Sequence, residues 1–584
     1  MKIKSEDEEF NKKHQSYFSN IFDLFRKNLT SNPDEKIRVF PIDTGLGKST
    51  RIQNFLREWK AKGFKNGESC ILFLSTVEEI CRYIEVIGFD RYEVAVVTKN
   101  EEANLLGSNN PNQSRIILTT HAMLKSRTLK KSFSKASEFY FQGKPRGLRI
   151  ADEALYRAEH IHLGRDSLLQ VIEPLRPYFP EWVEGLERFA SHIHALKPNS
   201  IIRFPDGFGK GRQYSFVEHG GPHLTDKQLE TLRHIKAAKG RRLKAVSGKK
   251  YGITLIGMGH PLPADIAPLF IFDASARVVE NYQLWADVDC NVEIMDPLVR
   301  DYDNLLVHIW KTACGRDFLA NPTNRDKLLR PIAKMMNADE RATLLVGYMN
   351  KGDCDLFEEL KSYLDKPELL HFRHWGNHHG TNEFRDIDRL VVIGCHLNRD
   401  TVYQAMHMAA TGADPESVIG NEWTQMRQGH LKGNLLQAFS RGTVRQGENG
   451  QCGKCDVYFI APPNPSPETL VREAFPNCRI EAWEPVKKAL TGQAKDIVDA
   501  VRQLRAQGRV GDVPKAEVRE LAGIANDRSF ANVLKRGDVV ATLTKLGVKV
   551  AHKYFAFNPS AEVIPIKSYG EQLIERRIER FIAG

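Results

Sequence analysis

The stretch Ile42-Asp-Thr-Gly-Leu-Gly-Lys-Ser-Thr50 decides the fold of this chain. It follows a short run, Arg38-Val-Phe40, that reads as a strand, and residues from Ser49 onward read as the start of a helix. Gly45 and Gly47 can adopt backbone angles that other residues avoid, so the chain can turn closely around an anion. A helix start behind such a turn offers free N–H groups and the positive end of its dipole. The order strand, glycine turn, helix therefore predicts a phosphate-binding loop.

A second stretch, Ile150-Ala-Asp-Glu-Ala-Leu155, places two carboxylates at the end of an apolar run. Together with the loop it supplies what a nucleoside triphosphate and its magnesium ion require. We expect Lys48 to reach the β- and γ-phosphates, and Ser49 and Asp152 to hold Mg2+. Glu153 is expected to orient or deprotonate the attacking water. The two stretches therefore predict a site for a triphosphate and Mg2+.

Further segments follow in a fixed order along the chain. They are Ile71-Leu-Phe-Leu-Ser-Thr76, Ile116-Ile-Leu-Thr-Thr-His121, Phe272-Asp-Ala-Ser-Ala276, Thr343-Leu-Leu-Val-Gly347, His379-Gly-Thr-Asn-Glu-Phe384 with Ile387 to Gly394, and Gln437-Ala-Phe-Ser-Arg441 with Arg445. With them, the chain resembles a superfamily 2 helicase of the DEAD/DEAH-like kind, as in bacteria and their mobile elements. The resemblance implies an α/β fold with two tandem RecA-like parallel-sheet domains and ATP bound between them.

The resemblance also implies roles for individual residues. The expected catalytic residues are Lys48, Asp152, Glu153, Gln437, Arg441 and Arg445, and those expected to bind Mg2+ are Ser49 and Asp152. The residues expected to bind the nucleotide are Thr44, Gly45, Gly47, Lys48, Ser49, Thr50 and Gly380. The residues expected to bind nucleic acid are Ser75, Thr76, Thr119, Thr120, His121, Thr381 and Asn382.

Three departures from the family pattern matter. Ile42 stands where the strict loop has glycine, which the shorter helicase form of the loop tolerates. The family spaces the two arginines of its last motif three residues apart, whereas Arg441 and Arg445 are four apart. Both can still share one helix face, and which of them is the arginine finger stays open. No adenine-reading glutamine stands just upstream of the loop, and Gln15 is unplaced, so ATP over other triphosphates rests on the resemblance.

Composition limits the class of protein. A chain of 584 residues is too long for one core and suggests several domains. The formal net charge of +11 is spread along the chain, which fits polyanion binding or simply a basic enzyme. The N-terminus lacks a hydrophobic signal region, and no apolar run of about 18 residues occurs, so we expect no membrane span. Nine scattered cysteines, an odd number, indicate a reducing cytoplasm.

The expected domains follow from the motif positions. They are an N-terminal helical segment (1–33), RecA-like domain 1 (34–155), an insertion domain (156–262), the end of RecA-like domain 1 (263–294), RecA-like domain 2 (295–465) and a C-terminal winged-helix-like domain (466–584). The apolar stripe Phe18, Ile21, Phe22 and Phe25 predicts a docked first helix. The proline-rich run 461–467 is expected to end the second domain.

Four features keep two readings each. The basic run Lys236 to Lys244, followed by Lys249 and Lys250, suits a phosphate backbone or a solvated hairpin tip. Cys452 and Cys455 form half of a zinc site or a plain turn, and an iron–sulfur cluster lacks the cysteines it needs. His371, His374, His378 and His379, with Trp375, suit a metal site or a loop that stacks on bases. The winged-helix-like unit is expected to contact DNA or to pack against a partner.

The sequence therefore predicts an ATP-dependent helicase or translocase with Mg2+ as cofactor, acting on nucleic acid, with DNA favoured over RNA. A protein partner could bind through the insertion or the C-terminal domain. Two alternatives remain: an ATP-driven switch or remodeller that does not separate strands, and the motor subunit of a defence or nuclease complex.

Overall fold

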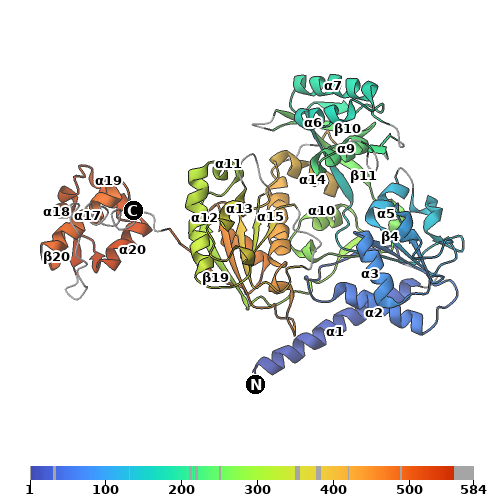
Figure 1. Cartoon of the computed structure of the whole chain (residues 1–584), viewed down its shortest axis with the longest axis horizontal. Coiled ribbons are helices and arrows are strands. Elements are labelled where there is room, and N and C mark those ends of the chain that lie inside the picture. The colour runs from blue at the N-terminus through green and yellow to red at the C-terminus, as the bar shows by residue number, and fades with distance from the viewer. Residues whose placement is uncertain are drawn as a thin grey trace. The chain divides into compact units, whose positions relative to one another are not determined.

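The computed structural model describes residues 2–29, 34–129, 132–209, 213–214, 216–217, 221, 223–248, 252–348, 355–376, 383–417, 420–486 and 490–557, with side chains from residue 9 onward. The chain forms two compact units, Met1–Trp483 and Glu484–Gly584 (Figure 1). Each unit is described by itself. Among the described residues, no helix combines the length and the apolar character that a membrane crossing requires.

A seven-stranded parallel sheet forms the first RecA-like domain, with strand order β13-β1-β12-β7-β2-β4-β3. Its strands are β1 (Ile37–Phe40), β2 (Cys70–Leu74), β3 (Val94–Val97), β4 (Ile116–Thr120), β7 (Leu148–Asp152), β12 (Leu269–Phe272) and β13 (Val292–Ile294). The strands are short apolar runs because both faces of a parallel sheet are buried. Their carboxyl ends meet at one edge, where ligands bind in such sheets.

Helices and short elements complete this domain. They are α1 (Lys2–Leu29), α2 (Lys48–Ala61), α3 (Val77–Ile87), α4 (Glu101–Asn104), α5 (His121–Arg127), α10 (Asn281–Val288), the 3-10 turns η1 (Phe133–Lys135), η2 (Ser137–Phe139), η3 (Ala264–Ile266) and η4 (Ala274–Arg277), and the hairpin β5 (Tyr140–Phe141) and β6 (Lys144–Pro145). Phe18, Ile21 and Phe25 of α1 are buried, and Phe22 stacks on Phe55 of α2 with ring centroids 5.3 Å apart. The predicted docking of the first helix is confirmed.

The insertion is an antiparallel sheet, β8-β11-β10-β9, with three helices of eight or more residues among its described residues. Its elements are β8 (Ala158–Gly164), α6 (Arg165–Leu175), α7 (Pro180–Ala195), β9 (Ile201–Arg203), α9 (Asp226–Ala238), β10 (Arg242–Ser247) and β11 (Ile253–Pro261). The Lys244 ammonium is buried and donates to Ser417 O at 2.7 Å, while Lys236 and Lys239 lie over the ring of Tyr214. These three lysines of the predicted basic run make contacts within the protein, and Lys249 and Lys250 lie outside the described residues.

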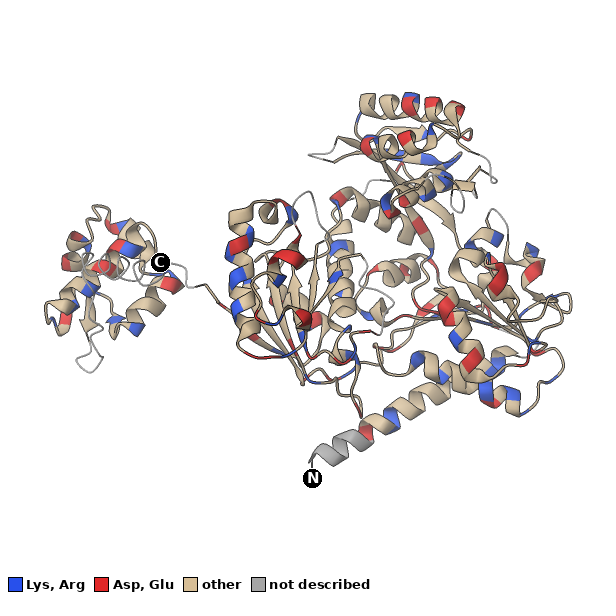
Figure 2. Ribbon diagram, in the orientation of Figure 1, with Lys and Arg blue, Asp and Glu red and all other residues tan. Residues whose placement is uncertain are grey.

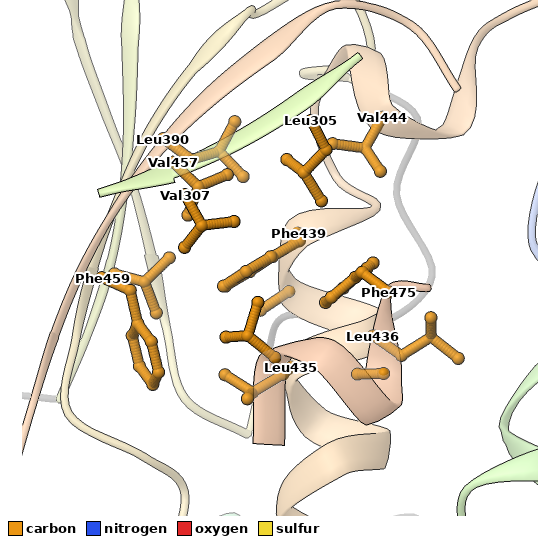
Figure 3. Packing of buried hydrophobic residues seen from close by; sticks show 14 of the residues in the cluster. Leu305, Val307, Leu390, Leu435, Leu436, Phe439, Val444, Val457, Phe459 and Phe475 are labelled. Carbon is orange, nitrogen blue, oxygen red and sulfur yellow. The ribbon is translucent and has the colours of Figure 1, made fainter. Parts of the chain in front are cut away.

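A six-stranded parallel sheet, β16-β15-β17-β18-β14-β19, forms the second RecA-like domain. Its elements are β14 (Leu305–Lys311), α11 (Arg316–Leu319), α12 (Pro322–Asn337), β15 (Thr343–Gly347), α13 (Leu356–Lys361), η5 (Pro367–Leu369), β16 (Leu370–His374), β17 (Arg389–Ile393), α14 (Asp400–Thr411), α15 (Trp423–Phe439), η6 (Thr443–Arg445), β18 (Cys455–Ala461), α16 (Pro467–Ala474) and β19 (Arg479–Ala482). Phe439 at the end of α15 packs among side chains of the sheet and stacks on Phe475, with centroids 4.9 Å apart (Figure 3). This packing fixes the chain just before the predicted arginines.

The second domain extends past residue 465, where the sequence placed its end. Helix α16 and strand β19 belong to it, because β19 pairs with β14. Pro467 is the first residue of α16, a position that proline favours because the N–H it lacks has no partner in the first turn. The first strand of the domain is β14, which agrees with the predicted start at residue 295.

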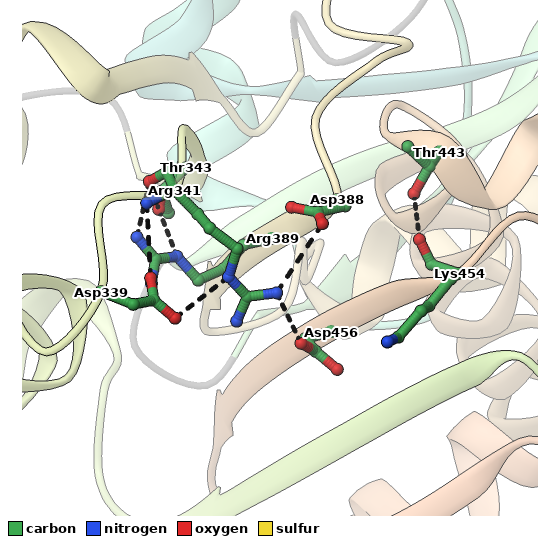
Figure 4. A network of polar contacts seen from close by, with 8 residues as sticks. All are labelled: Asp339, Arg341, Thr343, Asp388, Arg389, Thr443, Lys454 and Asp456. Carbon is green, nitrogen blue, oxygen red and sulfur yellow. Dashed lines mark hydrogen bonds and ion pairs between the residues drawn. The ribbon is translucent and has the colours of Figure 1, made fainter.

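Polar contacts join the amino ends of β15, β17 and β18 (Figure 4). The Arg389 guanidinium is buried and donates to Thr343 Oγ1 at 2.6 Å, and it pairs with Asp339. Arg341 donates to Asp456 Oδ2 at 2.8 Å. Because each contact joins different strands or the loops before them, this network fixes the register of the sheet beneath the segment that carries the arginines.

The C-terminal unit has a winged-helix-like arrangement. Its elements are α17 (Gln493–Ala506), β20 (Gly511–Pro514), α18 (Lys515–Leu521), α19 (Asp527–Val533), α20 (Gly537–Lys545), β21 (Val548–Val550) and β22 (Tyr554–Phe557), and the antiparallel strand order is β20-β22-β21. Ile497, Val501, Phe530 and Leu543 are buried together. The apolar stretch 530–546 is divided between α19 and α20, because Gly537 begins a new helix.

Candidate functional site

The phosphate loop, residues 42 to 48, joins β1 to α2. Gly45 and Gly47 both have φ of 81°, in the left-handed region, so glycine is required at these two turns. Gly47 is the N-cap of α2, and the helix starts at Lys48. The Lys48 ammonium donates to Ile42 O at 2.8 Å and to Asp43 O at 3.4 Å. The loop thus presents the start of a 14-residue helix and a lysine in one place, as phosphate binding requires.

Asp152 is the last residue of β7 and is 5% exposed. Ser49 Oγ donates to its Oδ2 at 2.7 Å, and the Tyr83 hydroxyl donates to the same oxygen at 2.8 Å. A hydroxyl oxygen and a carboxylate oxygen are donors that Mg2+ prefers, and few protein ligands suffice because the ion keeps several waters. Ser49 and Asp152 therefore fit the metal role that was predicted for them.

Glu153 has an unusual backbone. Its φ is +83°, a region that non-glycine residues rarely adopt, and its N–H donates to Phe272 O of β12 at 3.0 Å. The side chain is exposed, and Ser75 Oγ donates to its Oε2 at 2.6 Å. Such a backbone persists only where its surroundings enforce it, and it turns this carboxylate away from the direction of the strand.

The carboxylates around the loop influence one another and Lys48. Burial lowers the pKa of Lys48, while Asp152, Asp273, Asp43 and Glu153 act to raise it. Burial, together with the charges of Glu153 and Asp152, raises the pKa of Glu79 to about 7, although Glu79 accepts from the N–H groups of Ser75 and Thr76. Excess negative charge is thus concentrated where a divalent cation would bind.

The second domain contributes Arg441, which follows the end of α15 and is 7% exposed. Its guanidinium donates to Gln437 Oε1 at 3.2 Å. Burial and the charge of Arg445 lower the pKa of Arg441 to about 10, and Glu153 acts to raise it. Glu153 of the first domain is therefore near enough to Arg441 of the second to influence its pKa.

The two arginines do not share a helix face, contrary to our expectation. Helix α15 ends at Phe439, and Arg445 is the last residue of the separate turn η6. Burial and the nearby guanidinium groups of Arg300, Arg82 and Arg385 lower the pKa of Arg445. We call residues 443 to 446 the arginine turn.

The residues predicted to bind nucleic acid differ in what they already contact. Thr76 and Thr120 cap α3 and α5, where they accept from Glu79 N at 3.2 Å and Met123 N at 3.1 Å. Thr119 is fully buried and donates to Val97 O at 2.6 Å, so it does not reach solvent. The His121 ring contacts Phe73 O at 3.0 Å, and burial lowers its pKa to about 4. Ser75 is bound to Glu153. Thr381 and Asn382, together with the predicted nucleotide-binding Gly380, lie outside the described residues.

A buried polar cluster next to the loop was missed from sequence. Asp43 accepts from Arg277 Nε at 2.7 Å, the Tyr302 hydroxyl at 2.8 Å and Arg300 N at 3.0 Å. One signal was available: Asp43 is a carboxylate between the apolar Phe40 and Leu46, and such a position calls for buried partners. The identity of those partners, more than 200 residues away, was not readable.

The features that suggested metals are used otherwise. In the part of the chain that the structure describes, no group of three or more His, Cys, Asp or Glu side chains could hold a metal ion. Burial raises the pKa of Cys452 to about 11, which keeps it a thiol. Trp375 is buried and donates to Ile393 O at 3.0 Å, so its ring is not open for stacking on bases. His378 and His379 lie outside the described residues.

Gln15 is exposed on α1, whereas His14 contacts Leu46 O in the loop at 3.0 Å.

The sequence identity between this chain and known proteins is low. No family model and no curated protein matches the chain. Among solved structures, the apo form of XPD is 11% identical with a TM-score of 0.45, and the match covers 80% of this chain and all of that one. A DEAD-box helicase bound to single-stranded RNA and UDP-BeF is 12% identical (TM-score 0.36, 89% of this chain, 90% of that one). The DUF1998 helicase MrfA bound to DNA is 10% identical (TM-score 0.35, 94% of this chain, 57% of that one).

Proposed function

We propose that the protein is an ATP-dependent motor of the superfamily 2 helicase kind, which couples ATP hydrolysis to movement on nucleic acid, with DNA as its track. The observation that carries the proposal is the hydrogen bond between Ser49 and Asp152, which joins the phosphate loop to the second motif across 103 residues of sequence. A glycine turn without a role in phosphate binding would not be expected to lie against this carboxylate. Arg441 of the second domain lies within electrostatic reach of Glu153 at the same site.

The side chains divide the work of hydrolysis. Lys48 would leave the carbonyl of Ile42 and bind the β- and γ-phosphates, with the N–H groups at the start of α2. Ser49 and Asp152 would hold Mg2+, which when bound neutralises charge on the phosphates. Glu153 would orient the attacking water and accept its proton, and Arg441 and Arg445 would stabilise the charge on the transferred phosphoryl group.

Nucleic acid would bind along the carboxyl edge of the first sheet, near Ser75, Thr76 and Thr120. Figure 2 shows Lys and Arg spread over both sheet domains, the insertion and the C-terminal unit, interspersed with acids. The net charge of +11 supports attraction to a polyanion. Alternating strong and weak grip between nucleotide states would move the strand, because a ligand shifts a conformational equilibrium only through its differential affinity.

The test is ATP turnover by the purified protein alone and with single-stranded DNA, duplex DNA or RNA, beside Lys48→Ala. We expect turnover to rise with DNA and to be absent in the variant. Ordinary turnover by Lys48→Ala would overturn the site. Turnover indifferent to all three polymers would overturn the motor.

One observation favours the alternative of a switch that does not separate strands. The insertion, which interrupts the sequence of the first domain, contacts α14 of the second domain. His162 Nε2 lies 2.8 Å from Thr401 Oγ1, and Val246 and Ile256 pack with Met408. This contact between the insertion and the second domain would restrain separation of the two sheet domains. A displaced-strand assay separates the readings, because a switch would hydrolyse ATP on DNA without releasing a strand.

A further inference from the structure

We infer that Arg300 is a positioning residue that couples the phosphate loop of the first domain to the arginine turn of the second, with Asp43 as its buried anchor. The inference rests on the proposed ATPase function and concerns how Arg445 is held relative to the nucleotide. Arg300 lies in the connection between β13 and β14, the segment that joins the two domains.

The anchor is an enclosed carboxylate. Asp43 is fully buried, and its oxygens accept from Arg277, from the Tyr302 hydroxyl and from the backbone N–H of Arg300. A buried carboxylate is very costly unless it is paired and hydrogen-bonded. Residues 300 to 302 are therefore fixed against the phosphate loop, and the backbone of Arg300 cannot drift from it.

The side chain of Arg300 then reaches both sides of the cleft. Its Nη2 donates to Gly45 O in the phosphate loop at 2.9 Å. Its Nη1 donates to Val444 O at 3.0 Å and Gln446 O at 2.9 Å in the arginine turn. The planar guanidinium holds these three carbonyls in one fixed arrangement, which a lysine ammonium on its flexible stem does not reproduce.

The two backbones also touch directly. A Cβ atom built on Gly45 would lie 2.0 Å from Arg445 O, so the loop and the turn are in van der Waals contact at this point. On its other side the turn is tied to its own domain, because Gln446 Nε2 donates to Arg385 O at 2.7 Å and Thr443 Oγ1 donates to Lys454 O at 2.6 Å (Figure 4). Arg300 thus bridges two segments that are each hydrogen-bonded to other parts of the protein.

This arrangement gives a route from nucleotide to arginine. To reach a phosphate, Lys48 must leave the carbonyls of Ile42 and Asp43, which changes the contacts of the loop. Any accompanying shift of the Gly45 carbonyl acts on Arg300 and, through Val444 and Gln446, on Arg445 between them. Arg300 itself touches no predicted phosphate position, so its role is to place Arg445.

Arg300→Lys tests the inference, because it keeps the positive charge and removes the planar guanidinium that contacts the three carbonyls. We expect kcat for ATP to fall by as much as about 100-fold, the effect of misplacing a catalytic group by about an ångström. The Kd for a fluorescent ATP analogue is expected to stay within about twofold, since the nucleotide contacts are intact. Combining Arg300→Lys with Arg445→Ala should cost no more than Arg445→Ala alone, because the two changes remove one effect.

The matched control is Arg146→Lys. Arg146 is a buried arginine of the first domain, and it donates to backbone carbonyls that lie outside the phosphate loop, including Arg115 O at 2.7 Å. It should lower the melting temperature and leave kcat unchanged. If Arg300→Lys does not fold, Tyr302→Phe removes one donor to Asp43 and should lower kcat in the same direction by a smaller factor.

The inference is overturned if Arg300→Lys keeps the wild-type kcat, if its effect adds fully to that of Arg445→Ala, or if Arg445→Ala itself turns over normally. An inactive Lys48→Ala beside a fully active Arg300→Lys would overturn the coupling and leave the proposed ATPase intact. An active Lys48→Ala would instead overturn the proposed function.

Discussion

The Ser75 hydroxyl donates a 2.6 Å hydrogen bond to Glu153 Oε2, so the strand end predicted to grip nucleic acid also holds the predicted catalytic carboxylate. The helix that follows this strand end also contacts the predicted Mg2+ ligand, because Tyr83 in the middle of α3 donates to Asp152. A hydrogen bond donated to a carboxylate stabilises its charged form and makes it a weaker base. Binding of a nucleic-acid phosphate at this strand end would compete for the Ser75 hydroxyl and release Glu153.

Ser75→Ala should therefore raise ATP turnover in the absence of nucleic acid. A hydrogen bond with a net value of ~0.5–1.5 kcal/mol corresponds to an increase of about 2- to 12-fold. The stimulation by DNA should shrink by a similar factor. Steady-state turnover with and without DNA measures both, and Ser75→Thr, which keeps the hydroxyl, is the control. A fall in DNA-free turnover would mean that Ser75 orients Glu153 for catalysis.

Glu153→Gln should keep ATP bound and hydrolyse it slowly. The amide cannot accept the proton of the attacking water, and loss of such a group typically costs about 10²- to 10⁴-fold. The amide oxygen can still accept from Ser75. Binding of a fluorescent ATP analogue and single-turnover hydrolysis measure the two steps, with Lys48→Ala as the control that loses hydrolysis. Loss of ATP binding in a folded Glu153→Gln protein would contradict the assigned role.

Glu79 makes the protein's stability depend on pH. Its pKa is raised to about 7 from an ordinary value of 4.5, chiefly by burial and then by Glu153 and Asp152. Between these pH values the folded state binds more protons than the unfolded state, so this contribution to stability falls as pH rises from about 4.5 to about 7. Glu79→Gln keeps an oxygen for the N–H groups of Ser75 and Thr76 and removes the charge.

Melting temperatures at pH 5 and pH 8 test this effect. We expect Glu79→Gln to melt at a higher temperature than the wild type at pH 8 and near the wild-type temperature at pH 5. A variant that is less stable at both values would show that the cap of α3 depends on the ionised carboxylate.

Binding to nucleic acid should weaken steeply as salt rises, because each neutralised phosphate releases counterions. A protein that makes about 6–10 phosphate contacts loses about 10³- to 10⁵-fold in affinity between 50 and 200 mM salt. Fluorescence anisotropy of a labelled DNA across this range gives the slope. A flat response would exclude a binding mode built on phosphate contacts.

The sequence was most informative where the chemistry is local. The loop around Gly45 and Lys48 spans only a few residues, and so does the pair of carboxylates at the end of β7. The two parallel sheets follow from the short apolar runs along the chain. Thr119 shows how a local rule was overlooked: successive side chains of a strand point to opposite faces, so Thr119 and Thr120 could not both reach the ligand edge.

The errors arose where the outcome depends on distant partners. Pro467 reads as a helix breaker, yet it starts a helix whose following strand, β19, pairs with β14 more than 160 residues earlier. Asp43 and Arg300 are 257 residues apart, and no pattern in either segment names the other. Tertiary packing, which no local spacing encodes, decided both cases.

The contact of the insertion with α14 has a mechanical consequence. The two sheet domains are joined by the connection through Arg300 and also where Val246 meets Met408. A body held at two points can still turn about the line between them, whereas sliding or free separation would break one attachment. If both attachments persist during the nucleotide cycle of the proposed motor, its stroke would be a rotation about that axis, and the distance moved along the nucleic acid would grow with the distance of the binding residues from the axis.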